Sequence, residues 1–156
     1  MAQDLIEAVA EFMVAQMPRP ASVRERLDAL EKELLTHPQV EIPPRHYFAK
    51  GLYAREITIP AGTLLTGKIH TTQHLNIISQ GDISVLTENG PKRVQAPCTL
   101  VSPPGTKRAG YAHTDTVWTT IHANPDDLTN PDVLESILIT PTYLVEEVAC
   151  PSLPQP

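Results

Sequence analysis

Apolar residues recur at helical spacing in the first part of the chain. One apolar face over residues 3–17 carries Leu5, Ile6, Val9, Phe12 and Met13. A second helix is predicted to begin at Ser22, because Ser22 and Glu25 have the spacing of a capping box. Its apolar stripe consists of Val23, Leu27, Leu30 and Leu34. The pattern predicts a pair of N-terminal helices within residues 1–38, and the second stripe either packs on the rest of the fold or contacts a twin chain.

From about residue 40 the apolar positions alternate instead, which is typical of half-buried strands. Strands are expected at 54–59, 74–79, 82–87, 99–102, 107–112 and 116–122, and Asn89-Gly90 predicts a hairpin. Asn130-Pro131 predicts the start of a short helix, and 136–140 and 143–148 a last strand or arm. Residues 39–150 are thus expected to form a β-barrel, followed by a flexible tail over 151–156.

Two segments of this region resemble motifs of the cupin family. The first motif is Gly, five residues, His-x-His, three or four residues, Glu, six residues, Gly. Gly62, Lys68, His70, His74 and Gly81 reproduce that spacing. The second motif has Pro-x-Gly-x-x-His, and residues 103–108, PPGTKR, match it up to the last position. The resemblance covers about residues 53–123. It implies an all-β, cupin-type double-stranded β-helix, that is a jelly-roll barrel, behind the two N-terminal α-helices.

The chain departs from the family at the metal-binding positions. Where the resemblance implies three histidines and a glutamate around one ion, this chain has Lys68, His70, His74 and Arg108. Lysine and arginine offer no lone pair at neutral pH, so neither replaces a metal ligand. Two imidazoles alone make a poor site for a divalent ion, unless His113 folds inward as a third ligand. The metal hypothesis is therefore a metal-dependent enzyme, of isomerase or dioxygenase type, holding one Fe, Mn, Ni or Zn ion through His70, His74 and His113.

The same substitutions favour a negatively charged ligand. Strand alternation places the side chains of these segments on common faces, and if those faces line the barrel they form a basic pocket. The predicted ligand-binding residues are Lys68, His70, His74, Asn76, Arg108 and Tyr111, with Trp118 as a further stacking surface. Arginine binds carboxylate or phosphate groups with two parallel hydrogen bonds. The main prediction is a small binding protein for a phosphate- or carboxylate-bearing metabolite.

A third interpretation is a non-catalytic barrel in which the basic side chains reach solvent and the histidines are structural. The run from Pro104 to His122 also resembles small cupin-like proteins encoded by bacteriophages, a likeness that implies no activity. A structural or assembly role in a phage particle is the corresponding alternative.

Charge and composition exclude some classes of binding partner and indicate where the protein is located. The net charge of -6 and the absence of basic clusters argue against nucleic acid, and no apolar run is long enough to span a bilayer. Cys98 and Cys150 are expected to be unpaired thiols. The expected location is the cytoplasm, that of the host if the chain is phage-encoded, without secretion. Because strand edges of such barrels tend to be covered, a homo-oligomer, a dimer or larger, is expected.

Overall fold

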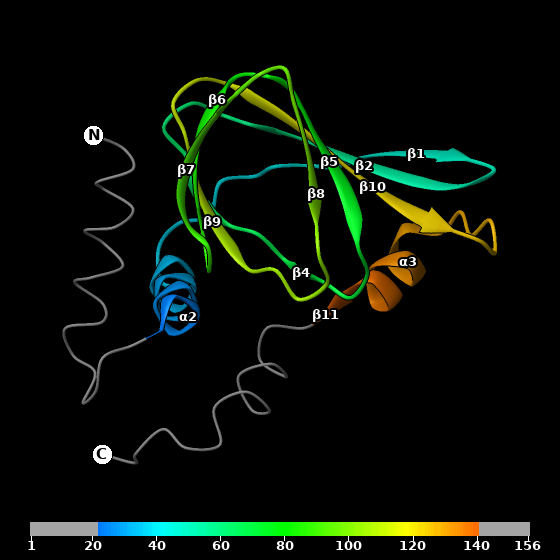
Figure 1. The fold of residues 1–156 in the computed structure, drawn as a ribbon, viewed down its shortest axis with the longest axis horizontal. Coiled ribbons are helices and arrows are strands. Elements are labelled where there is room, and N and C mark those ends of the chain that lie inside the picture. Colours follow the sequence, from blue (N-terminus) through cyan, green and yellow to red (C-terminus); the bar gives the residue numbers. More distant parts are fainter. Residues whose placement is uncertain (1–21, 141–156) are drawn as a thin grey trace, which may run out of the picture.

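The computed structural model describes residues 22–140, in which two antiparallel sheets face each other and two helices lie outside them (Figure 1). Helix α2 (Val23–Leu34) precedes the strands, and α3 (Pro131–Leu138) follows the last long one. The strands are β1 (Arg45–Ala49), β2 (Gly51–Ile59), β3 (Leu64–Thr66), β4 (Ile69–His70), β5 (His74–Gln80), β6 (Asp82–Thr87), β7 (Gly90–Gln95), β8 (Cys98–Ser102), β9 (Arg108–Ala112), β10 (Thr116–Asn124) and β11 (Ile139–Thr140).

The strand order identifies the fold. One sheet has the order β1-β2-β10-β5-β8, the other has β3-β9-β6-β7, and β4 pairs with β11. All these pairs are antiparallel. Without β1, the two large sheets have four strands each, and the first strands of the barrel pair with its last ones, β2 with β10 and β3 with β9. This is the arrangement of a jelly roll, so the predicted all-β jelly-roll barrel is confirmed.

The barrel core fills the space between the two sheets. Its main apolar cluster consists of Ile59, Ile78, Ile83, Val85, Val94, Ala112 and Trp118. At the β5–β6 corner, Gly81 has a φ of +102°, and a Cβ there would lie 2.5 Å from the Asp115 carbonyl oxygen. A glycine is therefore required at this corner, which explains the second glycine of the first motif.

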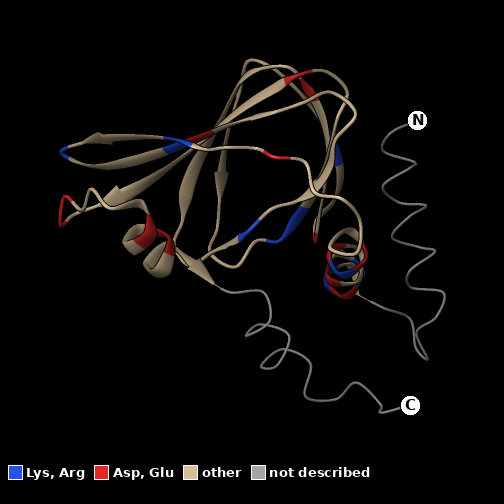
Figure 2. Cartoon of the chain, turned by 180° about the vertical axis from the view of Figure 1, so that it is seen from behind, with Lys and Arg blue, Asp and Glu red and all other residues tan. Residues whose placement is uncertain are grey.

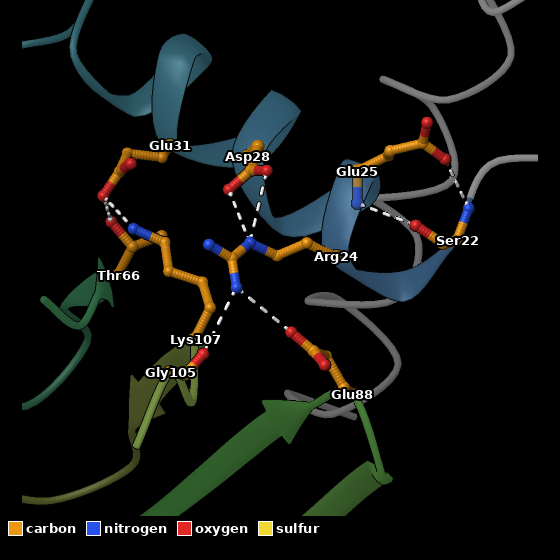
Figure 3. Close-up of polar contacts among 9 residues, drawn as sticks. All are labelled: Ser22, Arg24, Glu25, Asp28, Glu31, Thr66, Glu88, Gly105 and Lys107. Carbon is orange, nitrogen blue, oxygen red and sulfur yellow. Dashed lines mark hydrogen bonds and ion pairs between the residues drawn. The ribbon is translucent and has the colours of Figure 1, made fainter. Parts of the chain in front are cut away.

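Helix α2 begins as predicted. The Ser22 hydroxyl accepts from the Glu25 amide at 3.2 Å, and the Glu25 carboxylate accepts from the Ser22 amide at 2.8 Å (Figure 3). Its apolar stripe packs on the outer face of the four-stranded sheet, where Leu27 and Leu30 join one cluster with Leu86 of β6 and Ala109 of β9. The stripe therefore docks on the barrel.

A buried ion pair also connects α2 to the barrel. Lys107 is fully buried, and its ammonium group donates to the Glu31 carboxylate at 2.5 Å (Figure 3). The Thr66 hydroxyl of β3 donates to the same oxygen at 2.8 Å. Nearby, Arg24 donates to Glu88 and to the Gly105 carbonyl. Basic and acidic residues are interspersed along α2 (Figure 2), and Glu31 is the one that meets the buried lysine.

The chain after β10 was only partly predicted. Asn130 caps α3 through its side chain, as the Asn-Pro order indicated. The strand expected over 136–140 is reduced to Ile139–Thr140, because Ser136 and Leu138 belong to α3. The helix expected over residues 3–17, the arm over 143–148 and the tail over 151–156 lie outside the described residues.

Candidate metal centre

Three histidines from three strands meet inside the barrel. His70 ends β4, His74 begins β5 and His122 lies near the end of β10. The ring centroid of His70 lies 4.2 Å from that of His74 and 4.8 Å from that of His122. The ring centroids of His74 and His122 are 5.0 Å apart. One ring nitrogen from each of the three lies within 4.8 Å of the others. Such a cluster can present three nitrogen ligands to one ion.

Strand pairing brings the three together across a long stretch of chain. Along β10, Thr116, Trp118, Thr120 and His122 alternate with less buried residues and face the interior. Antiparallel pairing sets Thr120 opposite Asn76 of β5, which places His122 near the start of β5, where His74 lies. His70 enters from β4, which is held by β11.

The hydrogen bonds leave unshared lone pairs in the cluster. The His74 Nδ1–H donates to the Thr72 carbonyl at 2.9 Å, so its Nε2 carries a lone pair. In the described part of the chain, His74 Nε2 and His122 Nδ1 are buried without a hydrogen-bond partner. His70 Nδ1 and His122 Nε2 lie 3.1 Å apart, where one ring donates to the other. A backbone carbonyl that fixes the tautomer of one imidazole is a common feature around metal ligands.

Burial keeps these rings neutral. Burial, then the charges of His74, His122 and the nearby arginines, lowers the pKa of His70 to about 3. Burial, followed by His74 and Arg55, lowers the pKa of His122 to about 4. Burial also lowers the pKa of His74, although the hydrogen bond to Thr72 opposes it. At neutral pH all three imidazoles are therefore uncharged, so each carries one nitrogen lone pair, and the lone pair engaged between His70 and His122 becomes available to an ion when that hydrogen bond is broken.

The lowered pKa values predict acid sensitivity of the metal-free protein. His122 has a pKa of about 4 when folded against 6.5 for a free histidine, so unfolding takes up a proton between these values. Stability should be fully present above pH 6.5 and fall as the pH drops, by about 1.4 kcal/mol per pH unit for one such group. Denaturant unfolding of chelator-treated protein from pH 7 to 4.5 measures this. His122→Gln should flatten the curve, whereas substitution of the exposed His37 should not, and an unchanged slope in His122→Gln would contradict the assignment.

The histidine cluster opens into a cavity of about 110 Å³, enough for several waters or one small molecule. Its lining includes Tyr53, Arg55, Ile57, Ile59, Leu65, Lys68, His70, Asn76, Ile83, Val85, Arg108, Trp118, Thr120, His122, Leu134, Glu135 and Leu138. Arg55, Lys68 and Arg108 supply positive charge, and Glu135 is the one carboxylate in this described lining.

A hydrogen-bond network holds Arg108 in the cavity wall. Arg108 donates to the Ser102 hydroxyl, and its guanidinium carbon lies 5.7 Å from the centroid of the Trp118 ring. The Asn76 amide donates to Ser102 at 2.8 Å and accepts from the Trp118 indole at 2.9 Å. Burial lowers the pKa of Arg108, which still remains a cation at neutral pH. Asn76 thus positions Arg108 and Trp118, with its own polar atoms already engaged.

Lys68 lies at the cavity mouth and is paired with Glu135 of α3. Both side chains are about half exposed. The hydrogen bond from Lys68, ahead of the opposing effect of burial, lowers the pKa of Glu135. Lys68 therefore lines the pocket, but the carboxylate of Glu135 neutralises its charge.

Two of the predicted site residues lie on the other side of the sheet. Tyr111 packs with the apolar cluster under α2, on the outer face of the four-stranded sheet. His113 follows the same parity along the chain, and its Nε2 hydrogen-bonds the Ser84 hydroxyl at 2.8 Å. The expectation that Tyr111 and His113 face the pocket is corrected by this geometry: strand alternation turns Arg108 inward and both of these outward.

Two residues of the site were not predicted. His122 takes the place expected for His113, and Arg55 of β2 adds a second guanidinium to the cavity. The alternation of β10 contains the signal for His122, since Trp118 and His122 lie four residues apart on one face of a strand.

The two motif segments converge on this cavity. Lys68 and His70 from the first and Arg108 from the second line it, and His74 contacts His70. The fold that brings them together is a jelly-roll barrel.

Comparisons with known proteins give distant structural likenesses. No family model matches the chain, and no curated protein matches it either. A cupin-2 domain containing protein from Shewanella frigidimarina aligns with a TM-score of 0.45 and 14% identity over 60% of this chain and 90% of that one. The structure of KdgF from Halomonas sp. aligns with a TM-score of 0.47 and 18% identity over 59% of this chain and 91% of that one. A cupin domain from Bordetella pertussis aligns with a TM-score of 0.44 and 15% identity over 56% of this chain and 98% of that one. At these values the fold assignment rests on the strand order, and the function on the site itself.

In the described residues, no helix has both the length and the apolar character needed to cross a membrane.

Proposed function

We propose that this protein holds one divalent transition-metal ion through His70, His74 and His122 and binds a small anion beside it. The observation that carries the proposal is His74: its Nδ1 is committed to a backbone carbonyl while its buried Nε2 has no partner among the described residues and faces two more imidazoles. A buried nitrogen lone pair without a partner is unfavourable unless something binds it.

The donor set suits particular metals. Three neutral imidazoles without a carboxylate favour zinc, nickel or iron over manganese, which prefers oxygen ligands. An ion held by three protein ligands retains an open position, where it would act as a Lewis acid on a bound oxygen atom. The protein's own contribution is to keep the three rings neutral and oriented and to surround the open side with the cavity.

Charge favours an anion in that cavity. Arg55 and Arg108 line it beside the histidines, while Glu135 is already paired with Lys68. A divalent ion added to two guanidinium groups would leave a strong excess of positive charge in a partly buried space, which an anion relieves. Metal and anion should therefore bind with positive coupling, each raising the affinity of the other.

The test is a pair of titrations on the full chain. Calorimetric titration of chelator-treated protein with zinc should give one site per chain, and acetate should then bind the zinc-loaded protein. Arg108→Gln should weaken acetate binding roughly 10- to 100-fold, because a hydrogen bond to a charged group is lost. Arg45→Gln is the matched control, since Arg45 lies on β1 with a side chain that is 63% exposed. Failure of zinc to bind, or equal acetate affinity in both variants, would contradict the proposal.

A metal-dependent enzyme, of isomerase or dioxygenase type, is the second candidate. The observation in its favour is that the cluster offers three protein ligands and that two of them, His70 and His122, also line a cavity. Three protein ligands with one open position are typical of catalytic rather than structural sites. Screening the zinc- and iron-loaded protein against small carboxylic acids, with His74→Ala as the inactive control, would separate an enzyme from a binding protein.

A further inference from the structure

The inner wall of the barrel changes from polar to apolar along three neighbouring strands. On β10 the inward residues run from His122 through Thr120 to Trp118. Pairing sets Tyr53 opposite His122, Arg55 opposite Thr120 and Ile57 opposite Trp118 on β2. It sets Asn76 opposite Thr120 and Ile78 opposite Trp118 on β5. The interior is thus layered, with histidines first, then arginine and amide, then apolar side chains.

The apolar layer forms the inner end of the cavity. The mouth lies at Lys68 and Glu135, which are about half exposed and belong to the lining. Beyond the arginine layer the lining includes Ile57, Ile59, Leu65, Ile83, Val85 and Trp118. Ile57 and Leu65 are only partly buried although they pack against the barrel core, so they retain surface to cover. A ligand held by its charge at the arginines would place the rest of its body on this surface.

We infer that the ligand is a small monocarboxylic acid with a compact apolar body. Its carboxylate lies beside Arg108 and Arg55, and its apolar body covers Ile57 and Trp118. This inference rests on the proposed function, because it specifies the anion that the same pocket takes. A carboxylate offers two coplanar oxygens, which a guanidinium can bind with two parallel hydrogen bonds.

The chemistry of the inner end disfavours other anions. Hydroxyl groups of a sugar acid would lose their water against apolar side chains. The neutral polar groups of the layer above are already engaged, because Asn76 is bonded to Ser102 and Trp118, and the Thr120 hydroxyl donates to Asn76 at 3.5 Å. Inorganic phosphate would match the charge but leave the apolar surface uncovered. A body of about three or four carbon atoms fits a cavity of about 110 Å³ and gains from each buried methyl group.

A ligand series on the zinc-loaded full chain tests this. Isovalerate, glycerate, isovaleramide and inorganic phosphate are titrated calorimetrically. Isovalerate and glycerate share the carboxylate, and isovalerate and isovaleramide share the apolar body. Isovalerate should bind at least tenfold more tightly than each of the other three. Ile57→Ser should weaken isovalerate about tenfold and leave acetate unchanged, whereas Ile137→Ser, at an exposed position on α3, should change neither.

The outcomes separate this inference from the proposed function. Glycerate or phosphate binding as tightly as isovalerate would overturn the inference while leaving an anion site in place. Isovaleramide binding as tightly as isovalerate would also overturn it, because charge would then contribute nothing. If none of the four binds the zinc-loaded protein while acetate does, the inference fails alone; if acetate does not bind either, the anion part of the proposed function fails as well. If Ile57→Ser does not fold, the affinities of the wild-type protein for the four ligands still test the inference.

Discussion

Replacing His122 by alanine lowers the affinity for zinc by roughly 100-fold or more. His122 supplies one of only three imidazoles in the cluster, and loss of outer-shell partners alone typically costs 10- to 100-fold. The two rings that remain would make a poor site for a divalent ion. Competition with a chromophoric zinc chelator at pH 7.5 measures the affinity of the wild type and of each variant.

His113→Ala is the matched control for this prediction. His113 lies nearer to Arg108 in the chain than His122 does, but it is bonded to Ser84 on the outer side of the sheet. Its substitution should leave zinc affinity unchanged within a factor of about two, far below the loss predicted for a ligand. An equal loss in both variants, or no loss in His122→Ala, would show that the three-histidine cluster does not hold the ion.

Replacing Glu31 by alanine should lower the free energy of unfolding by about 3 kcal/mol, because it leaves a buried ammonium group without its partner. Lys107 is fully buried, and its bond to Glu31 is one of the polar contacts between α2 and the barrel (Figure 3). The double variant Glu31→Leu with Lys107→Met should regain most of the loss, since an apolar pair removes the uncompensated charge. Urea unfolding followed by tryptophan fluorescence at pH 7.5 provides the measurement.

Glu33→Ala provides the comparison on the same helix. The Glu33 side chain is 41% exposed and pairs with His37 on the surface, so its removal should change stability by less than about 0.5 kcal/mol. If Glu31→Ala were no more destabilising than Glu33→Ala, the ion pair would not hold α2 on the barrel.

Helices and strands were predicted well from the sequence, because caps and alternation depend on residues only a few positions apart. Ser22 and Glu25 cap α2 through contacts three residues apart, and Asn130 caps α3 in the same way. The strands after residue 50 follow from alternation, and the glycine at position 81 from a corner that excludes a side chain. The short strands β3 and β4 carry too few residues for a period to be recognised. Strand β1 is exposed at four of its five positions, so it shows no alternation of buried and exposed residues.

The site was predicted only in part because it depends on pairing between distant strands. His70 and His74 lie close together in the chain, but His122 joins them from 48 residues beyond His74 through the register of β10 with β5. His113 was considered as a third ligand if the turn after β9 folded inward, but its ring bonds the Ser84 hydroxyl on the outer side of the sheet instead. The orientation of Lys68 could not be predicted either, because its partner Glu135 belongs to α3, and its packing position is not encoded locally.

The most direct test of the metal centre is diffraction from crystals of the full chain grown with zinc, recorded on both sides of the zinc absorption edge. The metal site predicts one strong anomalous peak per chain, bonded to ring nitrogens of His70, His74 and His122 at about 2.0–2.1 Å. An ion bound elsewhere, or no anomalous peak among these three rings at saturating zinc, would contradict it.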